Sequence, residues 1–186
     1  MYKTNLMKKT SFITLLFVLA LTFSFNANAQ KFAKMDVSPM DTAAYPDDYR
    51  NSDKLIKITY SRPQLKSRAV SSLAPNGKVW RTGANEAAEL TLYTDMKMGG
   101  QTIKAGTYTF YTIPGDDEWT AVVSKDLNVW GSYFYDEAND VARMSVPCSN
   151  EGDSLEAFSI AFAESDSGVD MHLGWGTVRV AVPFTK

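Results

Sequence analysis

The stretch that decides the fold of this chain runs from residue 105 to residue 124, AGTYTFYTIPGDDEWTAVVS. Within it Tyr108 and Phe110 alternate with Thr109 and Tyr111, the period of two that is typical of a half-buried strand. The residues at 114–117, Pro-Gly-Asp-Asp, are those of a tight turn, and the run 119–124 is again rich in aromatic and β-branched side chains. We therefore predict a β-hairpin centred on this turn.

The same alternation extends outward on both sides of the hairpin. A Gly99-Gly100 pair predicts a second tight turn. Further along the chain, Pro147 is expected to end a strand over residues 141–146. No window of twelve or more residues after residue 30 has helical spacing, although residues 84–90 have room for one turn. The additional predicted strands are residues 55–60, 90–93, 101–104, 141–146, 158–162, 169–175 and 178–184, the last three forming a meander. The sequence therefore predicts an all-β domain, an antiparallel β-sandwich or flattened barrel.

The first 29 residues have the features of an export signal. Lys8 and Lys9 precede an apolar run over 12–25, and Ala27-Asn28-Ala29 has the small-x-small pattern that signal peptidase cuts after. A membrane anchor is the alternative, but about fourteen strongly apolar residues fall short of the roughly twenty that a span needs. We expect a mature protein that begins at Gln30, has no membrane anchor, and is located in the periplasm or outside the cell.

The predicted organisation is a signal peptide at 1–29, an extended lead-in without a packed element at 30–53, and one β-sandwich domain at 54–186. Without residues 1–29, sixteen basic side chains face twenty-one acidic ones, a net charge of about −5. Nucleic acid is therefore not an expected partner. Cys148 is the only cysteine, so it forms no internal disulfide, and we expect it to be partly buried and inert.

A compact candidate site lies in the block from Lys78 to Glu86, KVWRTGANE. If Gly83 adopts a positive φ, the chain turns there and brings Arg81 and Glu86 onto one rim. Trp80 would then offer a stacking platform, with hydrogen bonds from Arg81, Asn85 and Glu86 to a sugar or a carboxylated ligand. The alternative is a structural corner in which Trp80 is core and Arg81 pairs with Glu86.

Two charged segments are further candidates. Arg62, Lys66 and Arg68 form a basic cluster that could hold an anionic group or simply be a solvated loop. The acids at 116–118 lack the spacing of a calcium loop and are expected to form a polar hairpin tip. His172 is the only histidine, so a zinc site is not expected, and no other metal or cofactor is predicted.

Aromatic side chains are concentrated at 128–136, NVWGSYFYD. Gly131 disfavours a regular strand there, so several of the rings are expected to face outward from a loop or bulge. Exposed rings would indicate carbohydrate or peptide binding, and buried rings would extend the core. Glu86 could also act with Asp136, Glu137 or Asp140 in acid–base catalysis, if one carboxyl group were buried and the other solvated.

Several short motifs, taken in order, are similar to those of a family of secreted bacterial domains of unknown function, DUF2911, typical of Bacteroidetes. The motifs are residues 60–63 (YSRP), 66–68 (KSR), 77–86 (GKVWRTGANE), 105–108 (AGTY), 113–115 (IPG), 118–119 (EW), 130–131 (WG) and 140–141 (DV). The resemblance covers about residues 36–184. It implies an exported, single all-β domain with the block around Trp80 at its centre, and it implies no specific activity.

Three functions remain open from the sequence. The leading hypothesis is a binding or accessory module for a small molecule, a glycan or a protein, with a rim formed by Arg62, Arg68, Trp80, Arg81, Asn85 and Glu86. The second is a hydrolase that uses Glu86 and another carboxylate on a glycan or similar small substrate. The third is a structural interaction domain with an exposed strand edge and no cleft. The sequence makes no prediction about oligomeric state.

Overall fold

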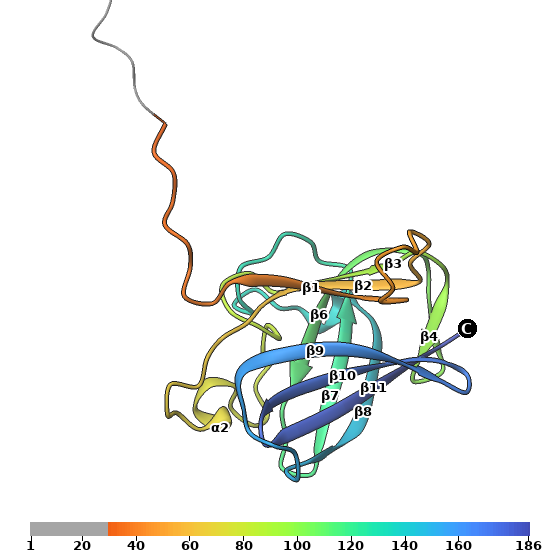
Figure 1. Ribbon diagram of the computed structural model, residues 1–186. Helices are drawn as coiled ribbons and strands as arrows, with labels where there is room; N and C mark the ends of the chain where they lie inside the picture. Colours follow the sequence, from red (N-terminus) through yellow and green to blue (C-terminus); the bar gives the residue numbers. More distant parts are fainter. Residues whose placement is uncertain (1–29) are drawn as a thin grey trace, which may run out of the picture. The chain divides into compact units, whose positions relative to one another are not determined.

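The computed structural model describes residues 30–186, so the predicted export signal lies outside the described residues. The domain treated below is the compact unit from Asp36 to Lys186. It is built almost wholly of antiparallel strands (Figure 1). The strands are β1 Met40–Tyr45, β2 Ile56–Ser61, β3 Ala88–Leu92, β4 Met96–Met98, β5 Gln101–Ile103, β6 Gly106–Ile113, β7 Glu118–Ser124, β8 Asp140–Ser149, β9 Leu155–Ser165, β10 Gly168–Gly176 and β11 Val178–Thr185. The short helices are α2 Val70–Leu73 and the 3₁₀ turn η2 Glu137–Asn139.

The strands form one antiparallel sheet in the order β1-β2-β3-β6-β7-β8-β11-β10-β9, and the β4–β5 hairpin joins it at β11. The two end strands, β1 and β9, lie next to each other, so the sheet curls into a nearly closed barrel. This confirms the predicted all-β class and the predicted antiparallel architecture. The predicted hairpin is β6–β7, and the predicted meander is β9–β10–β11.

Just past the end of β2, a backbone bridge pairs Gln64 with Ala157 on β9. Beside β2 itself, side chains close the seam between β9 and the β1–β2 edge. The hydroxyl of Tyr60, on β2, accepts a hydrogen bond from the Ile160 N–H at 2.8 Å and donates one to the Ile160 carbonyl at 3.4 Å. Arg62 donates from Nε to the Phe158 carbonyl and from Nη2 to Ser159 Oγ. Burial raises the pKa of Tyr60 above its ordinary value, so its hydroxyl keeps its proton further into the alkaline range. These contacts satisfy edge groups of β9 that would otherwise be free to pair with another chain.

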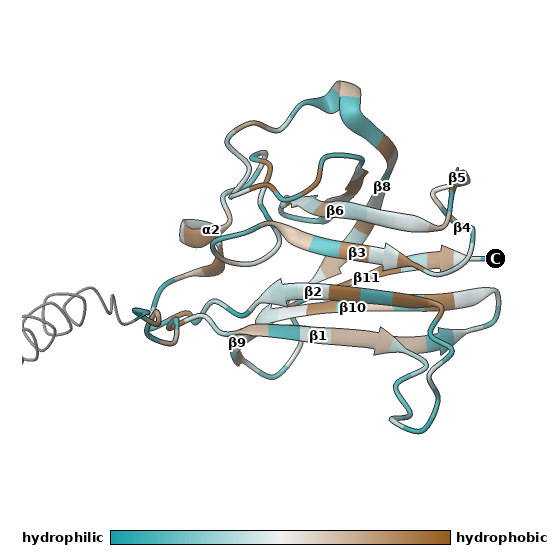
Figure 2. Cartoon of the chain, turned by 90° about the horizontal axis from the view of Figure 1, so that it is seen from above, coloured by the Kyte–Doolittle hydropathy of each residue, from teal (hydrophilic) through white to brown (hydrophobic). Residues whose placement is uncertain are grey.

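Hydrophobic side chains of alternate residues fill the barrel, and hydrophobic and hydrophilic positions alternate along β2 (Figure 2). An aromatic stack is the largest feature of this core. Trp80 and Trp175 stack with their centroids 5.4 Å apart and an interplanar angle of 11°. Trp119 and Phe158 meet Trp80 edge-on at 6.1 and 5.0 Å. The stack therefore consists of Trp80, Trp119, Phe158 and Trp175.

Two local predictions are wrong. The expected lead-in contains strand β1, because its backbone pairs with β2 along six residues although its side chains include few strongly apolar ones. Pro147 does not end β8. The Cys148 N–H bonds the Asp117 carbonyl at 2.9 Å and so continues the ladder with β7. Pro147 lies where its missing N–H would point away from β7, so the ladder does not need it.

Residues 84–90, which have room for one helical turn, do not form it, and the only α-helical turn among residues 30–186 is α2. No helix in this part of the chain has both the length and the apolar character needed to cross a membrane.

Candidate functional site

The block at 80–86 is partly core and partly rim. Trp80 is only 5% exposed and belongs to the aromatic stack, so it cannot act as a stacking platform for a ligand. A bridge to Thr112 places it there, with the Trp80 N–H 2.7 Å from the Thr112 carbonyl. For this residue the structural-corner alternative is correct.

The turn within the block differs from the prediction. Thr82 and Asn85 have positive φ angles of 52° and 61°, whereas Gly83 does not. Gly83 is instead needed for close approach, because a Cβ there would lie 3.0 Å from the Ser61 carbonyl oxygen. The block therefore turns at two non-glycine residues, with its glycine pressed against the end of β2.

Arg81 and Glu86 do not pair with each other. Glu86 is exposed and has no ion pair among the described residues. Arg81 is half-buried, and its Nε is buried without a hydrogen-bond partner in the described part of the chain. The paired corner predicted as the alternative is wrong in this respect, and the Glu86 carboxylate is open to solvent.

Of the three basic residues upstream, Arg62 and Arg68 are engaged within the domain, whereas Lys66 is exposed and bonds Glu156 only through its backbone N–H. Arg62 is at the seam, with a 3.0 Å ion pair to Asp41 in addition to its bonds to β9. Arg68 donates to the backbone carbonyls of Gln64 and Leu65. These contacts account for the positions of both arginine side chains without a ligand. Within residues 30–186, neither side chain forms a hydrogen bond to the 80–86 block.

The loop at 127–134, here called the aromatic loop, lies directly beside the block. Its exposed side chains are Leu127 (48%), Trp130 (57%), Tyr133 (75%) and Phe134 (88%). The sequence-based expectation of outward-facing rings is therefore confirmed for three of the four aromatic residues within 128–136. Tyr135 is half-buried.

Backbone bonds hold the aromatic loop against the block. Glu86 and Trp130 form an isolated antiparallel bridge. On either side of the bridge, the Ala87 N–H bonds the Val129 carbonyl at 3.1 Å, and the Gly131 N–H bonds the Asn85 carbonyl at 2.9 Å. Directly opposed residues of an antiparallel pair have Cβ atoms about 4.5–5.5 Å apart. The exposed carboxylate of Glu86 and the exposed indole of Trp130 are therefore neighbours on a fixed backbone.

A polar cluster around the buried Asp140 lies at the C-terminal end of the aromatic loop and anchors it. Asp140 Oδ2 accepts from the Tyr135 hydroxyl at 2.7 Å and from Arg143 Nη1 at 2.9 Å. Arg143 also pairs with Glu137 at 3.1 Å. The Asp140 side chain is 7% exposed, and burial raises the pKa of its carboxyl group against the opposing effects of Tyr135 and Arg143.

Tyr111 completes the support of this cluster from the sheet. It points away from the barrel core, yet it is 1% exposed, because Tyr135 covers it with ring centroids 5.3 Å apart. Burial, with the nearby Asp126 and Asp140 carboxylates, raises the pKa of Tyr111 to about 12. The loop therefore rests on a packed layer outside the barrel, a feature that no periodicity in the sequence indicates.

The carboxylates proposed to act with Glu86 have other contacts. Asp136 accepts from the Ala138 N–H and caps η2, and Glu137 pairs with Arg143. Asp140 is covered by Tyr135. None of the three shares a hydrogen bond or an ion-pair partner with Glu86 among residues 30–186. A catalytic carboxylate pair therefore has no support in the geometry.

The other polar candidates lie away from the aromatic loop. His172 is exposed on β10, and Asp116 on the β6–β7 turn accepts from Asn76. Cys148 is half-buried, as expected, and burial together with Asp117 raises the pKa of its thiol. Within residues 30–186 no three histidine, cysteine or acidic side chains are grouped in a way that could hold a metal ion.

Comparison with protein families gives a match. A family model described as "Protein of unknown function (DUF2911)" matches residues 38–184, nearly all of the domain. No curated protein and no solved structure matches the chain.

Proposed function

The chain belongs to the protein family of unknown function DUF2911, and we propose that it is an exported binding module that recognises a glycan through the aromatic loop. The observation that carries the proposal is the Glu86–Trp130 bridge, which places an exposed carboxylate beside an exposed indole. A sugar ring presents C–H groups on one face and hydroxyls at its edge. The indole suits the first, and the carboxylate accepts hydrogen bonds from the second.

The neighbouring residues favour the same ligand class. Tyr133 and Phe134 provide additional exposed rings on the same loop, enough for more than one sugar unit. The half-buried Asn85 amide lies next to Glu86 and adds a donor and an acceptor. Of the predicted rim residues, the proposed site keeps Asn85 and Glu86. Arg81 is kept only as a half-buried neighbour in the same block, and Arg62, Arg68 and Trp80 are left out.

Pre-organisation also favours a binding role. The aromatic loop is held by the backbone bonds at residues 85–87 and by the bond from Ser132 Oγ to the Val79 carbonyl at 2.8 Å. Asp140 and Tyr135 anchor its far end. A ligand that meets rings already held in place loses less free energy to ordering the site. Export, which rests on the first 29 residues, would place the module where extracellular glycans occur.

The test is thermal unfolding of the purified protein against a glycan library, with Trp130→Ala and Glu86→Gln in parallel. A ligand at a hundredfold excess over its dissociation constant stabilises the folded state by about 2.7 kcal/mol. For a domain of this size that raises the midpoint by roughly 5–10 °C. We expect both variants to lose the shift while keeping the ligand-free midpoint.

Tyr93→Ala is the matched control, because Tyr93 is also an exposed aromatic residue, at 51%, but lies outside the loop. It should keep the full shift. If no glycan raises the midpoint, or if Trp130→Ala responds like the unmodified protein, the glycan proposal is wrong. Binding of peptides in place of glycans on an array would assign the loop to a protein partner.

A further inference from the structure

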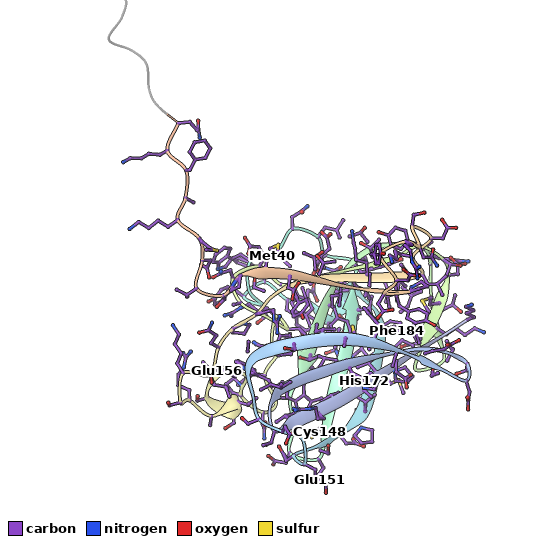
Figure 3. The ribbon with its side chains drawn as sticks, viewed as in Figure 1. Met40, Cys148, Glu151, Glu156, His172 and Phe184 are labelled. Atoms are coloured by element: carbon purple, nitrogen blue, oxygen red, sulfur yellow. The ribbon has the colours of Figure 1, made fainter. Side chains whose placement is uncertain are left out.

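A separate pocket lies away from the aromatic loop, where four segments meet. They are helix α2, the β6–β7 turn, the end of β8 and the β10–β11 turn. Figure 3 shows Cys148, which lines the pocket, toward the same end of the domain as Glu151 and far from Met40. The cavity volume is about 270 Å³, enough for a molecule the size of an amino acid or a monosaccharide.

The floor of this pocket is apolar. Ala74, Pro114 and Trp119 are buried there, and Val70, Cys148 and Val178 are half-buried. Trp119 belongs to the aromatic stack, so the floor rests directly on the core. A rigid apolar floor favours a ligand with an apolar body, because that body leaves water without forcing the core to move.

The rim is polar and carries a single charge. The exposed rim residues are Ser71, Asn76, Asp116, Asn150 and Thr177. Asp116 is the only charged residue that lines the pocket in the described part of the chain. Asn76 Nδ2 donates to Asp116 Oδ1, which fixes the carboxylate and leaves Oδ2 for a second donor. An anionic ligand would be repelled here, and a cationic one would be attracted.

We propose that this pocket binds a small primary amine with an apolar body. The ammonium group donates to Asp116 Oδ2 at the rim, with Asn150 and Thr177 beside it. The apolar body lies on the floor formed by Trp119 and Val178. This site is independent of the proposed glycan site, because it shares none of its lining residues with the aromatic loop or the 80–86 block.

Three probes with the same phenylethyl body and different head groups test the proposal: 2-phenylethylamine, 2-phenylethanol and 3-phenylpropanoate. The readout is the rate at which Cys148, half-buried in the pocket floor, is labelled at mildly alkaline pH by a pyridyl disulfide, a reagent that exchanges with thiolates and does not react with amines. The amine should protect the thiol best and the carboxylate least. A partly exposed ion pair is worth up to about 1 kcal/mol, so the amine should bind about two- to fivefold more tightly than the alcohol.

Asp116→Asn should make the amine and the alcohol bind equally. Asp117→Asn is the matched control, because it removes the neighbouring charge from a residue that does not line the pocket, and it should keep the preference for the amine. Thr177→Trp adds bulk at the exposed rim without touching the core, and should remove protection by every probe. The melting midpoint of each variant verifies that it is folded.

The proposal is overturned if no probe slows labelling, if the carboxylate protects best, or if the amine keeps its advantage in Asp116→Asn. Protection that survives Thr177→Trp would place the probes elsewhere and would also overturn it.

Discussion

The seam of the barrel predicts a specific loss of stability in Tyr60→Phe. The substitution keeps the ring, which packs edge-on against Phe158 with centroids 5.6 Å apart, and removes only the hydroxyl. That hydroxyl accepts from the Ile160 N–H at 2.8 Å and donates to its carbonyl at 3.4 Å. Because β9 has no backbone ladder on this side at Ile160, no other described group replaces the lost partner.

The magnitude follows from the buried N–H that remains. Leaving a buried donor without a partner costs about 1–3 kcal/mol, and the longer bond to the carbonyl adds little. For a domain of this size, 1 kcal/mol lowers the melting midpoint by roughly 2–4 °C. We therefore expect a fall of about 4–8 °C for a loss near 2 kcal/mol.

Calorimetry of the variant measures this fall, and Tyr108→Phe is the control. The Tyr108 hydroxyl donates to the Lys104 carbonyl at 2.9 Å in an exposed setting, so water can replace it, and the change should stay within about 0.5 kcal/mol. Amide exchange adds a local readout, since the Ile160 N–H should exchange faster in Tyr60→Phe. If the midpoint moves by less than about 1 °C and this exchange is unchanged, the hydroxyl does not hold the seam.

Three other substitutions test the core, the block and the layer beneath the loop. Gly83→Ala should destabilise the domain by about 1–3 kcal/mol in denaturant titration, because its new Cβ meets the Ser61 backbone at 3.0 Å; an unchanged midpoint would show that β2 yields there. Trp80→Ala should cost about 3–5 kcal/mol by the same measurement, whereas Trp130→Ala should cost little; similar losses would contradict the assignment of one to the core and the other to the surface. Tyr111 has a folded pKa of about 12, above the ordinary 10, so its contribution is complete below pH 10 and is lost as pH rises from 10 to 12. Tyr111→Phe should therefore flatten the alkaline fall in stability by on the order of 2 kcal/mol, and an identical slope in both proteins would refute the shift.

The sequence predicts most of the strands because their core faces alternate. In β9 and β11 one side chain in two enters the barrel, so burial appears directly as a period of two. In β6, β7 and β10 four consecutive residues are buried, so there the period of two lies in the residue types and not in burial. Strand β1 has no such hydrophobic alternation and was not predicted. Its partner β2 supplies the hydrogen bonds, and its own side chains are only half-buried, so its sequence carries little hydrophobic signal.

The site is less predictable for a related reason. The exposed rings of the aromatic loop were predicted from the aromatic composition and from Gly131, which disfavours a regular strand. In the structure Gly131 has a positive φ of 67° and lies outside any strand. The neighbour of Glu86 was not predictable. The bridge to Trp130 joins residues 44 positions apart, and nothing local in either segment specifies the pairing. The burial of Trp80 was not predictable either, because the local sequence of a tryptophan next to an arginine does not indicate whether its side chain faces solvent or the core.

The aromatic stack also determines how this protein can be observed. Of its four tryptophans, Trp80, Trp119 and Trp175 belong to the stack, and only Trp130 meets solvent. A neutral quencher such as acrylamide therefore reaches one indole and leaves the emission of the other three intact until the barrel opens. Quenchable fluorescence thus reports on the aromatic loop, and protected fluorescence reports on the core. A single untagged sample can then follow ligand binding and unfolding as separate signals.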